Sequence, residues 1–243
     1  MRWRGIAIGL LILVLARTVP VLAADEESCP DVPIAPLVLP ATNGAVARGQ
    51  PIVIVSLGSS SSRGAGASDA AHSYPAILQV TLNHLLPKAH VSVINRGNDG
   101  EDATQELARL GIDVLALVPR LVIWQVGANG ALRGTDPAVF RALVAAGVSR
   151  LSEGGADVIL MDNQRAPKIL NAPHRKDMED ALADVAAKSR VNLFSRGALM
   201  DAWRDLGSGY DMFLGPDGLH HNDRGYRCLA EGLARAISAA LTR

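Results

Sequence analysis

The sequence predicts an α/β fold, a doubly wound parallel sheet covered by helices, and two observations support this prediction. Short apolar runs alternate along the chain with longer segments of helical period. The apolar runs are continuous rather than alternating, which is typical of parallel strands that are covered on both faces. Five such strands are expected, at residues 52–57, 91–95, 121–126, 157–161 and 191–194.

Helices are expected between these strands, because parallel neighbours are joined by right-handed crossover connections. The segments with helical period are residues 74–87, 102–117, 137–153, 174–189 and 197–206. A last helix is expected from about Asp223, as its N-cap, to about Leu241, because Leu229, Leu233 and Ile237 recur at helical spacing.

The composition is that of a globular protein with one domain or at most two small ones. The chain has 243 residues, of which 49% are hydrophobic and 20% are charged. Its formal net charge is zero, which gives no electrostatic argument for nucleic-acid binding. Aromatic residues make up only 4%, so few side chains are available to stack on bases. No nucleic-acid partner is therefore expected.

The N-terminus has the pattern of a secretory signal peptide, predicted at residues 1–23. Arg2 and Arg4 precede an apolar run at 5–16, and small residues end at Ala23 as a signal peptidase requires. An uncleaved membrane anchor is the alternative. The run is well short of the roughly 20 residues that span a bilayer, and Arg17 ends it. The mature protein is expected to be periplasmic or secreted, without stable membrane insertion.

Residues 24–49 are expected to form a Pro-rich arm on the surface of a domain at 50–243. Prolines 30, 33, 36 and 40 forbid a helix between residues 25 and 40 and disfavour a central strand.

Cys29 in this arm and Cys228 in the last predicted helix favour a disulfide in an exported protein. Such a crosslink contributes roughly 4–5 kcal/mol at most. Two free thiols are the alternative.

A ligand site in such a fold lies beyond the carboxyl ends of the strands. Small and polar residues follow four of the predicted strands, at 58–62, 95–100, 127–130 and 161–164. A further loop at 216–221 precedes the last helix and can fold back to the same edge of the sheet. These segments therefore hold the candidate functional residues.

The chemistry that these loops fit best is acyl transfer by an activated serine. Asp217 and His220 are three residues apart, so the carboxylate can orient one imidazole nitrogen while the other faces a hydroxyl. Ser60 after the first strand is the expected nucleophile, and Ser61 is the alternative within the serine run. Gly97 can supply an unobstructed backbone N–H and Asn129 a side-chain amide to a developing oxyanion.

Four blocks occur in order at the predicted strand ends: Gly58-x-Ser60, Gly97, Gly127-x-Asn129 and Asp217-x-x-His220. Together with Gly225-Tyr226, they resemble the blocks of the SGNH (GDSL-like) hydrolases over residues 50–241. The resemblance implies a three-layer, flavodoxin-like fold with a five-stranded parallel sheet. It also implies a Ser60–His220–Asp217 triad, and an oxyanion hole of the Ser60 N–H, Gly97 and Asn129. No metal or cofactor is expected.

Two positions depart from the family pattern. Ser59 stands where the family has Asp before its serine, and Gly130 stands where it has Asp after its asparagine. Neither position belongs to the triad, so the departures bear on substrate preference and loop geometry more than on the reaction type.

Four further residues at the same edge are candidates for substrate contact: Ser59, Asp162, Gln164 and His221. Asp162 and Gln164 can equally be hydrogen-bonding framework. A metal site at His220 and His221 is a weaker interpretation, because no second cluster of ligands is evident in the sequence.

The sequence therefore predicts a serine esterase that acts on carboxylic esters, such as O-acetyl groups on glycans or lipid esters, through an acyl-enzyme. One alternative is an acyltransferase that passes the acyl group to an envelope glycan. Another is a non-catalytic glycan-binding envelope protein with a hydrolase fold.

Overall fold

The computed structural model describes residue 1 and residues 28–242. The predicted signal peptide thus lies almost wholly outside the described residues. The domain is built on one parallel sheet with the strand order β2-β1-β3-β4-β5. The strands are β1 (Ile52–Gly58), β2 (Val91–Gly97), β3 (Leu121–Gln125), β4 (Asp157–Met161) and β5 (Asn192–Phe194). The predicted doubly wound, flavodoxin-like sheet is confirmed.

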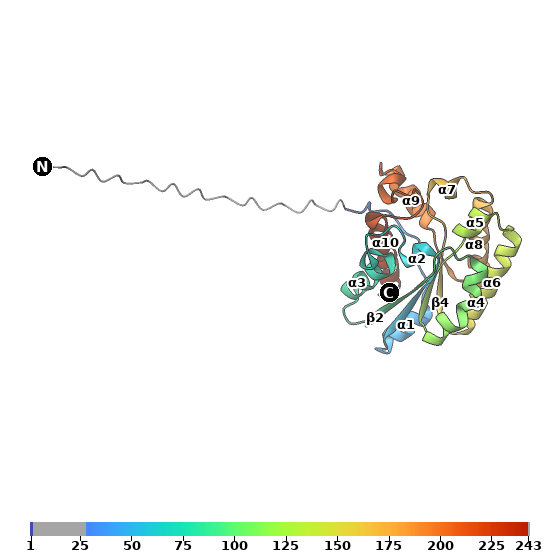
Figure 1. Ribbon diagram of the computed structural model, residues 1–243. Helices are drawn as coiled ribbons and strands as arrows, with labels where there is room; N and C mark the ends of the chain where they lie inside the picture. The colour runs from blue at the N-terminus through green and yellow to red at the C-terminus, as the bar shows by residue number, and fades with distance from the viewer. Residues whose placement is uncertain (2–27, 243) are drawn as a thin grey trace.

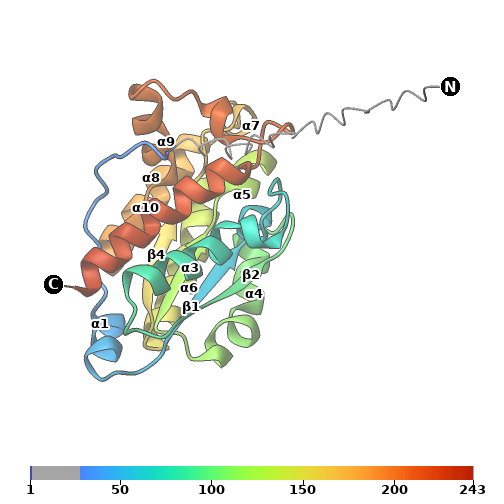
Figure 2. The same cartoon turned by 90° about the vertical axis from the view of Figure 1, so that its left-hand side faces the viewer.

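Helices cover both faces of this sheet and make three layers (Figures 1 and 2). One side carries α3 (Tyr74–Leu85) and α10 (Asp223–Leu241), and the other carries α4 (Ala103–Asp113), α6 (Pro137–Glu153) and α8 (Arg175–Ser189). Successive side chains of a strand enter opposite layers: in β3, Leu121 and Ile123 join the first core, and Val122 and Trp124 join the second. The three central strands are buried along almost their whole length.

The long helices lie close to their predicted positions, and their starts follow from capping side chains. Asp136 accepts N–H bonds at the start of α6, and Asp102 forms a capping box with Gln105 at the start of α4. The expected cap of α10 is wrong by one residue. Asn222 rather than Asp223 caps this helix, because its side-chain oxygen accepts the N–H of Gly225.

Four short helices of the described chain were not expected from the sequence, because helices of eight residues or fewer are too short to show a recognisable amphipathic period. They are α1 (Pro40–Ala47), α2 (Ser60–Arg63), α5 (Ala128–Arg133) and α7 (Pro167–Leu170). Pro40 begins α1 because proline is tolerated in the first turn, where its missing N–H has no partner to lose. The remaining helix, α9 (Arg196–Asp205), follows β5. One-turn helices also occur at η1 (Ala70–His72), η2 (Leu115–Leu117) and η3 (Tyr210–Phe213).

The segment 28–39 contains neither helix nor strand and runs along the domain. It is fixed at one end by a disulfide between Cys29 and Cys228 of α10. Further along, the backbone of Val38 exchanges two hydrogen bonds with the side chain of Asn192 in β5. Within the described residues, none of the helices is long and apolar enough to span a membrane.

Candidate active site

A continuous chain of hydrogen bonds links Ser60, His220 and Asp217 at the carboxyl edge of the sheet. The Oγ of Ser60 lies 2.8 Å from Nε2 of His220, and Nδ1 of His220 lies 2.6 Å from Oδ2 of Asp217. An ionised carboxylate only accepts hydrogen bonds, so the imidazole proton belongs on Nδ1. Nε2 is then free to accept the hydroxyl proton of Ser60, which is the arrangement of a nucleophile, a base and an orienting acid.

The loop that carries Asp217 and His220 holds the carboxylate in its ionised form. Oδ1 of Asp217 accepts the backbone N–H groups of Leu219 and His220, at 2.9 and 3.0 Å. Partial burial raises the pKa of Asp217, but the hydrogen bonds from the His220 ring and these N–H groups outweigh burial and lower it to about 2. Asp217 is therefore an anion throughout the neutral pH range.

The turn from β1 into α2 exposes one serine of the run and buries the others. Ser60 begins α2, where backbone N–H groups have no partner inside the helix. Ser61, the alternative nucleophile, is only 2% exposed. Ser62 is fully buried, and its hydroxyl lies 3.3 Å from the hydroxyl of Tyr74. Ser60 is thus the serine that meets the imidazole.

Ser59, which replaces the family's Asp, belongs to the framework beneath the nucleophile. It is buried, and both its backbone N–H and its hydroxyl donate to Oε1 of Gln125 at the end of β3. A Cβ on the preceding Gly58 would lie 2.4 Å from the Ser62 hydroxyl and 2.8 Å from the Gln125 carbonyl oxygen. The absence of a side chain at Gly58 therefore lets the nucleophile turn pack directly on β3.

The structure does not support the role expected for Gly97. Its N–H already donates to Oδ1 of Asn95, at 2.9 Å. A Cβ at this position would lie 2.2 Å from the backbone nitrogen of Arg63, so glycine is required here for α2 to approach β2. Asn129 fits its expected role better. Its Nδ2 donates one hydrogen to the carbonyl of Glu101, at 2.8 Å, which fixes the amide and leaves its second hydrogen for another acceptor.

Asp162, Gln164 and His221 are buried and bonded to the scaffold, which favours the framework interpretation that the sequence left open for Asp162 and Gln164. Gln164 donates to the carbonyl of Leu219, inside the Asp217–His220 loop, and accepts from Arg196. Asp162 accepts from the Ser195 hydroxyl and the Gly197 N–H.

His221 faces the interior, away from the position that a metal interpretation requires. It is 0% exposed, and its Nδ1 lies 2.9 Å from the carbonyl of Phe213. Burial, followed by the nearby Arg196 cation, lowers the pKa of His221 to about 3, so the ring is neutral. In the described part of the chain, no group of three His, Cys, Asp or Glu side chains is arranged to hold a metal ion.

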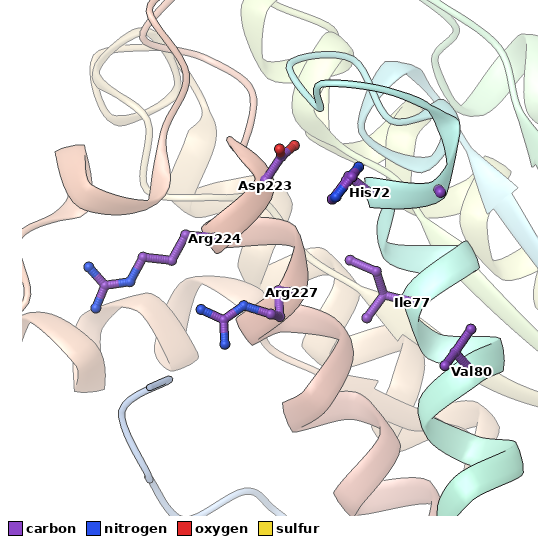
Figure 3. A pocket seen from close by; sticks show the side chains of 7 residues that line it. His72, Ile77, Val80, Asp223, Arg224 and Arg227 are labelled. Carbon is purple, nitrogen blue, oxygen red and sulfur yellow. The ribbon is translucent and has the colours of Figure 1, made fainter. Parts of the chain in front are cut away.

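Two of the hollows in the described part of the chain lie close to the loop at 214–222 or to the start of α10. One, of about 350 Å³, adjoins the Asp217–His220 loop through Gly215 and Gly218, and is walled by Leu170 of α7 and by Tyr210. The other, of about 400 Å³, lies between α3 and α10 (Figure 3). The side chains of Arg224 and Arg227 point away from His72 there, and none of the triad residues lines it. Only the first hollow is therefore adjacent to the triad loop.

Comparison with known proteins agrees with this architecture. The model of the Non-GDSL lipase-like family matches residues 28–243. The chain belongs to this family. The family name agrees with the missing Asp before Ser60, and the SGNH-type resemblance predicted from the four sequence blocks is confirmed. No curated protein sequence matches the chain.

Solved structures similar to this Non-GDSL lipase-like protein include several esterases. A lipase/acylhydrolase from Enterococcus faecalis shares 25% identity over 77% of this chain and 96% of its own, with a TM-score of 0.66. A two-domain esterase active on acetylated mannans shares 21% over 86% of this chain and 56% of its own, with a TM-score of 0.71. An acetyl xylan esterase shares 20% over 76% and 100%, with a TM-score of 0.65. Family and fold together support an ester-hydrolysing enzyme.

Proposed function

We propose that the protein hydrolyses carboxylic esters through an acyl-enzyme on Ser60. The observation that carries this proposal is the hydrogen-bond chain from Ser60 through His220 to Asp217, with distances of 2.8 and 2.6 Å. Ser60 and His220 are 160 positions apart in the sequence, so it is the fold that brings them into hydrogen-bond contact at one edge of the sheet.

Each step moves one proton through His220. The Ser60 oxygen attacks the ester carbonyl while its proton passes to Nε2 of His220. The imidazolium then gives that proton to the departing alkoxide, which leaves as an alcohol. Water attacks the acyl-enzyme in the same manner, with its proton passing first to His220 and then back to the Ser60 oxygen. Asp217 stays ionised throughout and stabilises the imidazolium, consistent with its low pKa.

The negative charge on the carbonyl oxygen is stabilised by two donors. One is the backbone N–H of Ser60, at the start of α2. The other is the second side-chain hydrogen of Asn129, whose first hydrogen is held by the Glu101 carbonyl. Gly97, with its N–H bonded to Asn95, serves as a packing residue rather than a donor.

The substrate class that fits best is an acylated glycan, with a lipid ester as the alternative. The hollow beside the Asp217–His220 loop offers Tyr210 as an aromatic wall and the carboxylate of Asp211 as a hydrogen-bond acceptor. A sugar ring can pack against the aromatic side chain, and its hydroxyl groups can donate hydrogen bonds to the carboxylate. The predicted signal peptide and the Cys29–Cys228 disulfide support action outside the cytoplasm, where such esters occur.

The decisive experiment is labelling of the protein with a fluorophosphonate, with the modified residue mapped by mass spectrometry. A single adduct on Ser60, lost in Ser60→Ala, supports the proposal, and hydrolysis of p-nitrophenyl acetate supplies the activity. Adding a glycan acceptor separates transfer from hydrolysis. A folded protein with no adduct on Ser60 contradicts the proposal and favours a binding protein.

A further inference from the structure

Arg109, a residue of α4 outside the triad, lies at the junction of the loops that form the site. Its side chain is 15% exposed. Its guanidinium donates to the carbonyl oxygens of Gly58 and Arg96, at 3.2 and 2.8 Å, and to the carboxylates of Glu101 and Asp113, at 2.6 and 3.0 Å. One side chain thus binds four acceptors.

Two of these acceptors belong to residues that adjoin or bind the groups proposed to act on the ester. Gly58 ends β1, two residues before Ser60, and its carbonyl also accepts the N–H of Asn98. Glu101 offers its carboxylate to Arg109 and its carbonyl to Nδ2 of Asn129. The Arg109 guanidinium therefore connects the segment that presents Ser60 with the residue that orients Asn129.

A second arginine also binds the loop between β2 and α4. Arg133, on the same helix as Asn129, donates to the carbonyl of Gly100 at 2.6 Å and to the carboxylate of Asp102 at 2.7 Å. The loop at 98–102 is therefore bound by Arg133 through Gly100 and Asp102 as well as by Arg109 through Glu101. Of the two arginines, Arg109 is the one that also reaches the nucleophile strand.

Only arginine suits this position. Its planar guanidinium carries five N–H donors in a fixed geometry, whereas a lysine ammonium is a single point with three donors. A lysine at residue 109 keeps a positive charge near Glu101 and Asp113. With three donors at one point, it cannot bind the two carboxylates and the two separate carbonyl groups that the guanidinium binds.

We propose that Arg109 is a positioning residue that fixes Asn129 relative to Ser60. This inference rests on the proposed esterase function. In that reaction the Ser60 oxygen and the Asn129 amide act on opposite ends of one carbonyl group, so their separation must match the transition state. A donor displaced by about 1 Å loses much of its effect on the transition state and little of its effect on substrate binding.

The test is a double-mutant cycle between Arg109→Met and Asn129→Ala, with kcat and KM measured on p-nitrophenyl acetate. In the natural background, Arg109→Met is expected to lower kcat about 30-fold, with KM within about 2-fold. In the Asn129→Ala background, the same substitution is expected to lower kcat less than about 3-fold, because the group that it positions is gone. A general structural defect would instead give the same factor in both backgrounds.

Arg165→Met is the matched control. Arg165 is 11% exposed and also binds two carboxylates, those of Glu179 and Asp201, but it contacts neither the nucleophile turn nor the β2–α4 loop. It is expected to lower the melting temperature with kcat within about 2-fold. Arg109→Lys covers the case in which Arg109→Met does not fold, and its kcat is expected to fall by a similar factor to that of the methionine variant.

Two results would overturn the inference: kcat within 2-fold of the natural protein in a folded Arg109 variant, or equal losses in both backgrounds. Ser60→Ala in the same assay separates this from failure of the proposed function. If the natural protein is inactive, or if Ser60→Ala keeps full activity, the esterase mechanism itself is wrong. If Ser60→Ala is inactive and the Arg109 variants are not impaired, only the positioning role is wrong.

Discussion

The two sides of the candidate site are held by different kinds of contact. On the nucleophile side, formed by the turn at 58–63, the loop at 95–102 and Asn129, charged pairs link the loops near the surface. Arg63 pairs with Asp99, both more than half exposed, and Arg109 and Arg133 both bind the loop. On the histidine side, formed by the loop at 214–222 and its supports, the contacts are buried. Gln164, Arg196 and His221 are at most 1% exposed.

This difference has a physical consequence for how each side responds to change. Ionic contacts that reach solvent are weak individually, and water replaces a lost partner. A buried polar group that loses its partner has no such replacement, so its desolvation is not compensated. The histidine side should therefore respond to substitution through stability, and the nucleophile side mainly through the rate of reaction.

The largest expected effect is on the triad, where the two sides meet. His220→Ala and Ser60→Ala are each expected to lower kcat by at least about 10³-fold, and the double variant by no more than either single one, because the two groups act as a unit. Steady-state hydrolysis of p-nitrophenyl acetate measures this. Full activity in His220→Ala, or additive losses in the double variant, would contradict a joint role.

The second largest effect is expected from loss of the disulfide, which is attached to α10 on the histidine side. Cys228 lies in α10, eight residues after His220, and its bond to Cys29 closes a separation of 199 residues. Replacing both cysteines by alanine is expected to lower the free energy of unfolding by about 2–4 kcal/mol. Urea unfolding measures this change. Reductant should lower the midpoint of the natural protein and leave that of the variant unchanged. Equal midpoints for the natural protein and the variant without reductant would refute the prediction.

Gln164→Leu tests the buried support of the histidine loop directly. The Leu219 carbonyl loses a donor and the buried Arg196 guanidinium loses an acceptor, so unfolding is expected to become easier by about 2 kcal/mol. The control is Gln50→Leu. Gln50 is exposed and accepts only from arginine side chains at the surface, so a change within about 0.5 kcal/mol is expected. Similar effects in the two variants would remove the contrast between buried and exposed contacts.

The sequence was sufficient to predict the sheet and to single out Ser60, His220 and Asp217, which the structure brings together, but it was insufficient for the residues that support them. Continuous apolar runs located the strands, and the spacing of Asp217 and His220 indicated the loop because reactive geometry is local there. The role of Gly97 could not be decided from the sequence, because a glycine needed for close packing and one needed as a donor look the same there.

The supports depend on tertiary contacts that no local pattern encodes. Arg109 reaches Gly58 across 51 positions, and Arg196 reaches Gln164 across 32. An arginine or a glutamine at helical or strand-end spacing is ordinarily a solvated residue. Burial likewise favours a framework role for Ser59, Asp162 and His221, which were candidates for substrate contact.

The smallest expected effect separates the two sides by pH. In α4, the helix whose Arg109 binds the nucleophile side, burial raises the pKa of Glu106 to about 8, although its hydrogen bond from Trp124 acts in the opposite direction. The folded protein then keeps a proton that the unfolded chain releases above about pH 4.5, so stability falls as the pH rises from there to about 8. On the histidine side, His221 has its pKa lowered to about 3 and stays neutral when folded. Stability therefore rises with pH between about 3 and 6.5.

These opposing contributions overlap below about pH 6.5 and separate above it, where only the Glu106 contribution remains. Between pH 6.5 and 8, the free energy of unfolding is expected to fall by at most about 1.4 kcal/mol per pH unit. Glu106→Gln keeps an oxygen to accept the Trp124 N–H and removes this titration, so its stability should fall less steeply than that of the natural protein in this window. Urea unfolding at half-unit steps of pH measures both proteins. If the natural protein and the variant show the same slope, Glu106 does not keep its proton in the folded protein. Water then reaches its carboxyl group despite its burial in the structure.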